Sequence, residues 1–224
     1  ELYGLYEARQ AMRSIEQLVV VEGYMDAVAL ARHGSDFAVA TLGTATTPEH
    51  LNRLFRLTEN VFFALDVDRA FRKAAWRALE NALPLIREGR QIRFMFLPEG
   101  HDPDSYVNEL GTDAFLTALD EGVALSEFLI EELAGQVDMN TVDGRARLAE
   151  LARPLVNKVP AGVYRELLID SLAERVGLMA AKLEKTLGSN SKDSKHAQVP
   201  SGAPKSRGRK QAAAGQPSVI RHSI

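Results

Sequence analysis

Apolar residues along the chain form two kinds of pattern, one typical of strands and one typical of helices. Four short apolar runs rich in β-branched and aromatic residues predict strands, at residues 18–21, 37–40, 61–65 and 92–97. Between these runs, apolar residues recur at spacings of three and four, which predicts helices. Regular alternation of strand and helix favours a parallel sheet with right-handed crossovers. The nearly continuous apolar character of the strands agrees, because a parallel sheet is covered on both faces.

Local signals place some of the helix ends. Thr47 is suited to the N-cap of the helix that follows the second strand, and Pro48 to its first turn. Gly89 is a candidate for ending the helix that follows the third strand. From Thr112 onward the apolar spacing is helical only, which predicts an all-helical subdomain after the sheet.

These patterns predict an α/β fold, with a four-stranded parallel sheet flanked by helices and a helical subdomain behind it. The expected parts are the end of an upstream subdomain at residues 1–17, the α/β domain at 18–111, the helical subdomain at 112–187, and a flexible basic linker at 188–224. Because the chain begins with Glu1 rather than Met, we expect a fragment or a processed piece.

Composition narrows the class of protein. The chain has 224 residues, 46% of them hydrophobic and 25% charged, as in ordinary globular proteins. No apolar stretch approaches the roughly 20 residues that a membrane helix requires, so we expect no membrane segment. The absence of cysteine excludes disulfides and thiolate zinc sites and fits the reducing cytoplasm.

The net charge of −3 hides an uneven distribution. Residues 188–224 carry seven Lys or Arg and one acid, whereas residues 1–187 carry 20 basic and 29 acidic residues. The body of the chain therefore cannot bind nucleic acid through its bulk charge, and any such binding has to be local.

Carboxylates follow three of the four predicted strands. Glu22 comes directly after the first strand, Asp66 and Asp68 after the third, and Asp102 and Asp104 after the fourth. The carboxyl ends of parallel strands meet at the edge where open α/β sheets bind ligands. Clustered carboxylates without His or Cys favour Mg²⁺ or Mn²⁺, and they imply phosphoryl chemistry. Each acid taken alone has another explanation, because acids commonly cap helices in such loops.

Four motifs resemble the TOPRIM module of DnaG-type DNA primases. They are VVVEGYMD at residues 19–26, LGTAT at 42–46, DVDRA at 66–70 and DPD at 102–104. The similarity runs from about residue 1 to about residue 187. It implies a DNA-directed RNA polymerase that makes short RNA primers on single-stranded DNA, by nucleotidyl transfer from ribonucleoside triphosphates, in the cytoplasm as part of the bacterial replisome.

The resemblance also assigns residues. Glu22, Asp66 and Asp68 would be catalytic. The expected ligands of Mg²⁺ or Mn²⁺ are Glu22, Asp26, Asp66, Asp68, Asp102 and Asp104. The expected nucleotide and template contacts are Gly43, Thr44, Arg69, Arg72 and Lys73, with Arg77 continuing the basic stripe. For the last set a plain turn and a solvated helix face are equally ordinary explanations.

The chain departs from the family pattern at two positions. Where relatives usually have glycine within and after the second acidic motif, this sequence has Val67 and Phe71. A ring at residue 71 takes space that glycine leaves open, so a catalytically inactive binding module is one alternative. Another is a fragment of a TOPRIM nuclease or topoisomerase. By the resemblance, the family's zinc site lies in a missing upstream domain, and contact with the replicative helicase lies in a missing C-terminal domain.

Overall fold

The computed structural model describes residues 1–42, 45–65 and 69–188, with the backbone alone for 69–71. The described residues belong to one compact unit. Its strands are β1 (Gln17–Val21), β2 (Ala38–Ala40), β3 (Asn60–Leu65), β4 (Gln91–Phe96) and β5 (Val123–Ala124). Its α-helices are α1 (Leu5–Ala11), α2 (Tyr24–Arg32), α3 (Pro48–Leu54), α4 (Arg69–Ala82), α5 (Pro103–Leu110), α6 (Thr112–Asp120), α7 (Leu125–Ala134), α8 (Val142–Val156), α9 (Val163–Val176) and α10 (Ala180–Gly188).

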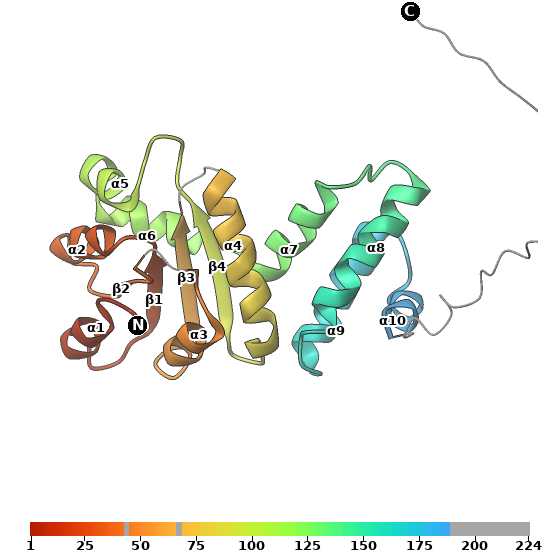
Figure 1. Cartoon of the computed structure of the whole chain (residues 1–224), viewed down its shortest axis with the longest axis horizontal. Coiled ribbons are helices and arrows are strands. Elements are labelled where there is room, and N and C mark those ends of the chain that lie inside the picture. Colours follow the sequence, from red (N-terminus) through yellow and green to blue (C-terminus); the bar gives the residue numbers. More distant parts are fainter. Residues whose placement is uncertain (43–44, 66–68, 189–224) are drawn as a thin grey trace, which may run out of the picture. The chain divides into compact units, whose positions relative to one another are not determined.

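The five strands form one sheet in the order β2-β1-β3-β4-β5 (Figure 1). β1 pairs in parallel with β2 and β3, and β3 pairs in parallel with β4. The predicted parallel sheet of four strands is thereby confirmed, and each strand begins or ends within one residue of its predicted bounds. The short strand β5 adds an antiparallel edge that the sequence pattern does not reveal.

Alternate residues of each strand enter two separate cores. Val20, Phe63 and Phe94 face one core, which also contains residues of α3, α4 and α7 to α10. Val19 and Met95 face the other, with residues of α2, α5 and α6. The sheet is therefore covered on both faces, as its continuously apolar strands require.

Two of the predicted helix ends can be compared with the structure. Thr47 caps α3, since its hydroxyl oxygen accepts a hydrogen bond from the His50 amide at 3.3 Å, and Pro48 opens the helix as predicted. The prediction for Gly89 is wrong. α4 ends at Ala82, and a 3-10 turn (Leu83–Leu85) containing Pro84 follows, because proline lacks the amide that would continue an α-helix. Gly89 lies instead in the turn before β4, with φ of +87°.

The chain beyond residue 111 contains both sheet-bound and helical parts. α6 packs against β4, and β5 pairs with β4, whereas α8 packs against α7 and α9. The division at residues 111 and 112 stays a prediction, as does the linker, which lies outside the described residues from 189 on. Across the described part of the chain, no helix combines the length and apolar character needed to cross a bilayer.

We predict that Phe94→Ala destabilises the fold by about 3–5 kcal/mol, because it removes a large fully buried side chain. The Phe94 ring lies 5.3 Å from the ring of Phe63 and 4.8 Å from that of Phe128, so its loss leaves a cavity between the sheet and α7. Urea unfolding measures the change. Met25→Ala, at a residue that is 60% exposed, is the control and should stay within about 0.5 kcal/mol of the parent. A Phe94→Ala loss as small as the control's would contradict the packing described here.

Candidate metal and nucleotide site

Three chain segments that carry acids leave the sheet at one edge. β1, β3 and β4 are parallel, so their carboxyl ends lie side by side. Glu22 follows the last residue of β1, and the loop after β4 leads to Asp102. Asp66 and Asp68, predicted after β3, lie outside the described residues, as do Gly43 and Thr44. The segment after β3 nonetheless starts from the same edge, because Leu65 pairs with Phe96 at the ends of β3 and β4.

Asp26 stands in the first turn of α2 and is half-buried. Its carboxylate accepts a hydrogen bond from the Gly23 amide at 3.1 Å. Burial raises the pKa of Asp26 above its usual value, and the negative charges of Asp102 and Asp104 raise it further. This repulsion shows that acids from two segments, α2 and the start of α5, lie close enough to interact.

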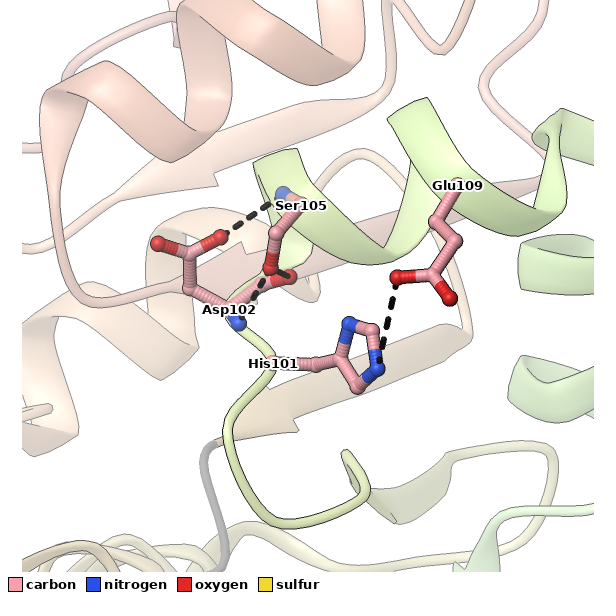
Figure 2. Close-up of polar contacts among 4 residues, drawn as sticks. All are labelled: His101, Asp102, Ser105 and Glu109. Atoms are coloured by element: carbon pink, nitrogen blue, oxygen red, sulfur yellow. Dashed lines mark hydrogen bonds and ion pairs between the residues drawn. The ribbon is translucent and has the colours of Figure 1, made fainter.

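Asp102 is the N-cap of α5 (Figure 2). Its carboxylate accepts a hydrogen bond from the Ser105 amide at 2.7 Å, and the Ser105 hydroxyl accepts one from the Asp102 amide at 2.9 Å. Hydrogen bonding to Ser105 lowers the pKa of Asp102, so this residue stays ionised. Asp104, in the first turn of the same helix, accepts a hydrogen bond from the Asn108 side-chain amide at 2.6 Å. Asp102 is thus a helix cap, as the alternative explanation from sequence holds. The same hydrogen bonds keep its carboxylate charged beside Asp26 and Asp104.

His101 supports the loop that carries Asp102, a role for which its sequence spacing gave no signal. Its ring stacks edge-on against Tyr106 with centroids 5.8 Å apart, and its Nε2 lies 3.8 Å from a carboxylate oxygen of Glu109 (Figure 2). The Nδ1 atom is buried and has no hydrogen-bond partner among the described residues. The ring therefore anchors the loop to α5 mainly by packing.

The donor chemistry of this edge fits a hard divalent cation. Within the described ranges, no three His, Cys, Asp or Glu residues are grouped so that they could hold a metal ion by themselves. The acids at this edge offer only oxygen, which suits Mg²⁺ or Mn²⁺. A cation would also relieve the repulsion that raises the pKa of Asp26.

Beside β1, a small pocket and a strained residue mark the expected nucleotide loop. Glu22 lines a pocket of about 30 Å³ together with Thr41 and Thr46, large enough for one water-sized particle. Leu42 has φ of +57°, a left-handed conformation that costs a non-glycine residue about 1–2 kcal/mol. Strain of this kind is common at functional loops, and it directly precedes the predicted contacts at residues 43 and 44.

The basic stripe on α4 is only partly available to a ligand. Arg72 forms an ion pair with Glu132 of α7, and its guanidinium carbon lies 5.5 Å from the centroid of the Phe96 ring. Lys73 is exposed. The side chain of Arg69 is not among those described. Nucleotide or template binding by these residues stays a prediction, and Arg72 has a structural role whether or not it binds a ligand.

Comparison with known proteins places this site in a family. A Toprim-like family model matches residues 19–107, and a model described as the DnaB-helicase binding domain of primase matches residues 126–180. A solved DnaG catalytic core superposes with a TM-score of 0.78 at 50% identity, over 82% of this chain and 59% of that one. The chain belongs to the DnaG-type DNA primase family. The similarity covers both the acidic edge and the helices that follow it.

Individual relatives agree with this assignment. The DNA primases of Pasteurella multocida and of Escherichia coli K12 are each 52% identical, over 85% and 80% of this chain and over 33% and 31% of their own lengths. A DNA primase domain from Pseudomonas aeruginosa has a TM-score of 0.80 at 48% identity, covering 84% of this chain and 59% of that one. The chain thus spans about a third of the curated primases it matches.

The comparisons bear on two of the expectations from sequence. The relatives are DNA primases, so a TOPRIM nuclease or topoisomerase fragment is not favoured. Helicase contact was expected only through a missing C-terminal domain. The family model named for helicase binding matches helices within this chain, from the start of α7 to the start of α10, which supports a helicase partner.

We predict that Asp26→Asn stabilises the protein at pH 7.5 in EDTA. Because the folded-state pKa of Asp26 is raised, its ionisation disfavours folding, and this penalty is absent below its ordinary value of 3.8 and grows as pH rises through the folded pKa. Asn keeps an oxygen that can accept the Gly23 hydrogen bond. Urea unfolding should show the stabilisation at pH 7.5 and little of it at pH 3.5. An equal gain at both values would show that charge is not its cause.

We predict a split between two substitutions of Asp102. Asp102→Ala removes the N-cap of α5 and should cost about 1 kcal/mol, whereas Asp102→Asn keeps a capping oxygen and should cost about half of that or less. Both remove the carboxylate, so both should weaken Mn²⁺ binding measured by electron paramagnetic resonance. If Asp102→Asn binds Mn²⁺ like the parent, the residue is a cap and not a ligand.

Proposed function

We propose that this chain is the catalytic part of a primase that synthesises short RNA primers on single-stranded DNA from ribonucleoside triphosphates. The observation that carries the proposal is the parallel pairing of β1, β3 and β4, which brings the segments that carry Glu22 and Asp102 to one carboxyl edge of a TOPRIM-like sheet. One similar structure, with a TM-score of 0.78 at 50% identity, is that of a DnaG primase catalytic domain bound to single-stranded DNA. Template binding by this chain is proposed by analogy with it.

In this proposal the acids act by position and charge. Glu22, Asp66 and Asp68 form the catalytic set, and Asp26, Asp102 and Asp104 complete the ligand cluster. These acids would hold Mg²⁺ or Mn²⁺, which when bound would supply charge to lower the pKa of an attacking 3′-hydroxyl and to offset that of the departing pyrophosphate. The Gly23 and Ser105 amides hold Asp26 and Asp102 in place by their hydrogen bonds. These donors orient the cluster before substrate arrives, which reduces the reorganisation needed during the reaction.

The nucleotide and template contacts lie around this cluster. Gly43 and Thr44 would allow close approach of the triphosphate. Arg69 and Lys73, at the start of α4, would hold phosphates of template or nucleotide, and Arg72 would do so only by giving up its pair with Glu132. A DnaB-type replicative helicase is the proposed protein partner, through the region that matches the helicase-binding family model. The proposed location is the bacterial replisome in the cytoplasm.

The test is template-directed ribonucleotide incorporation on single-stranded DNA with Mg²⁺ or Mn²⁺. We predict that Asp66→Ala lowers incorporation at least about 100-fold, because a lost metal ligand removes several kcal/mol of transition-state stabilisation. Asp170→Ala, an exposed acid on α9, is the matched control and should leave the rate unchanged. Incorporation that survives in Asp66→Ala would contradict the assignment of the acids, and strand scission by the parent would favour a nuclease.

The variant Phe71→Gly distinguishes an active primase core from a catalytically inactive binding module. Glycine restores the family residue at this position and opens space at the start of α4. Incorporation by the parent, lost in Asp66→Ala, supports an active core. Incorporation that appears only in Phe71→Gly identifies a primase-derived module whose site is blocked by the ring.

A further inference from the structure

A hollow lies at the end of the sheet opposite the acidic edge, around the turn that leads into β4. Its volume is about 240 Å³, and it is lined by residues 86–93, 124–126 and Tyr164. β4 runs from this turn, at the bottom of Figure 1, to the loop before α5 at the top. Because a strand rises about 3.3 Å per residue, the six residues of β4 separate its two ends by roughly 17 Å. This β4 hollow is therefore separate from the acidic edge.

The floor of the β4 hollow is apolar and one wall is aromatic. Ile86, Ile92 and Leu125 line it and are each at most 3% exposed. Tyr164 is partly buried, which raises the pKa of its phenol, and a hydrogen bond joins its side chain to that of Ser126. This bond fixes the orientation of the ring. The lining suits a flat apolar or aromatic group.

Three arginines border the hollow, and the structure holds two of them in place. Arg90 donates a hydrogen bond to the Leu85 carbonyl oxygen at 2.7 Å, and its guanidinium carbon lies 4.5 Å from the centroid of the Phe55 ring. Arg93 donates to two carbonyl oxygens near the start of β5, at 3.2 Å and 3.1 Å. Each guanidinium has five N–H donors, so most of them stay available to a ligand.

The third arginine, Arg87, is exposed, and no ion pair is found for its side chain within the described residues. Burial lowers the pKa of Arg90, and the charge of Arg87 lowers it further, whereas Glu59 acts in the opposite direction. The two guanidinium groups therefore lie close enough to repel each other. An anion bound between them would relieve this repulsion.

The charge of the lining is positive, in contrast to the rest of the body. Glu88 is the acid among the lining residues, and its carboxylate already accepts a hydrogen bond from the Val163 amide at 3.2 Å. The lining thus carries three positive charges against one negative, although residues 1–187 have 20 basic and 29 acidic residues. Guanidinium groups match phosphate in charge and in the geometry of their donors.

The combination of an apolar floor with bordering arginines selects the kind of ligand. Inorganic phosphate would leave the floor and the Tyr164 ring without contacts. A single-stranded nucleic acid requires a basic track along the surface, which an acidic body does not offer beyond the hollow. A mononucleotide has both an aromatic base and a phosphate within one small molecule.

We propose that the β4 hollow binds a mononucleotide, with its base against Tyr164 and the apolar floor and its phosphates at Arg87, Arg90 and Arg93. The proposal does not depend on primer synthesis, because the hollow lies at the end of β4 that is remote from the acids. The bound nucleotide is therefore a ligand of a second site and not a substrate. Since Arg93 also holds the backbone before β5, binding should stabilise this edge of the sheet.

The test is isothermal titration calorimetry of the whole chain with ADP and with GDP, in EDTA. EDTA removes divalent cations, so nucleotide binding through a metal at the acidic edge does not contribute. Arg87→Glu reverses the charge at the hollow. Arg13→Glu, at an exposed arginine in the turn before β1, is the matched control. We expect Arg87→Glu to weaken binding at least about tenfold and Arg13→Glu to stay within about twofold of the parent.

A second pair of variants tests the contact with the base. Tyr164→Ala removes the aromatic wall, whereas Tyr164→Phe keeps the ring and loses only the hydroxyl. Tyr164→Ala should weaken binding at least about fivefold, and Tyr164→Phe should stay within about twofold of the parent. Circular dichroism and unfolding midpoints confirm that every variant is folded at the temperature of the titration.

The outcomes separate the possible ligands. Binding of ADP or GDP that is weakened in both Arg87→Glu and Tyr164→Ala, with both controls like the parent, establishes the site. No binding to the parent, or equal binding to all variants, overturns it. Pyrophosphate that binds as tightly as ADP would show that the base makes no contact, which also overturns the proposal. A short single-stranded oligonucleotide that binds through Arg87 where ADP does not would make nucleic acid the ligand instead. Primer synthesis is judged separately, because none occurs in EDTA.

Discussion

The parallel pairing of β1, β3 and β4 is the constraint on which the site depends. Its register joins Val20 to Phe63 and Phe63 to Phe94, and alternate residues enter the two cores. A slip by one residue would move every side chain to the opposite face, so burial of both faces fixes the register. The same register aligns the carboxyl ends of the strands. The acidic edge is therefore a consequence of core packing, and no acid has to contribute to folding for the acids to meet.

Acids that lie near one another repel, and the structure offsets this repulsion better at Asp102 than at Asp26. Asp102 accepts the Ser105 amide and has a lowered pKa, while Asp26 accepts the Gly23 amide and still has a raised one. Hydrogen bonds from Ser105 are thus enough for the exposed carboxylate of Asp102, whereas the Gly23 amide is too little for a half-buried one facing two other acids. The remaining penalty is concentrated at Asp26. A cation bound at this edge would relieve it, so metal binding and folding are linked most strongly through that residue.

Sequence patterns predicted what local chemistry determines and missed what tertiary contacts determine. The apolar runs located β1 to β4 and thereby the edge where Glu22 and Asp102 lie, and Thr47 marked the start of α3. Pro84 ends α4 earlier than predicted. The proline is visible in the sequence, but the prediction placed the helix end at Gly89. β5 has two residues, too few for any periodicity. The partner of Arg72 stands 60 positions away on α7, and the partner of Glu131 stands 44 positions away on α9. Nothing in the local sequence encodes either.

The contacts of Arg72 also limit how strongly α9 and the acidic edge can influence each other. Arg72, at the start of α4, pairs with Glu132, and the neighbouring Glu131 pairs with Arg175 of α9. These pairs form the charged connection between the segment after β3 and α9. Both are largely exposed, with Arg72 at 53% and Arg175 at 43%, and exposed pairs contribute about 1 kcal/mol at most. A change at α9 could therefore alter binding affinity at the acidic edge by no more than about fivefold through this route. The acids are therefore positioned mainly by the sheet and by their own backbone donors.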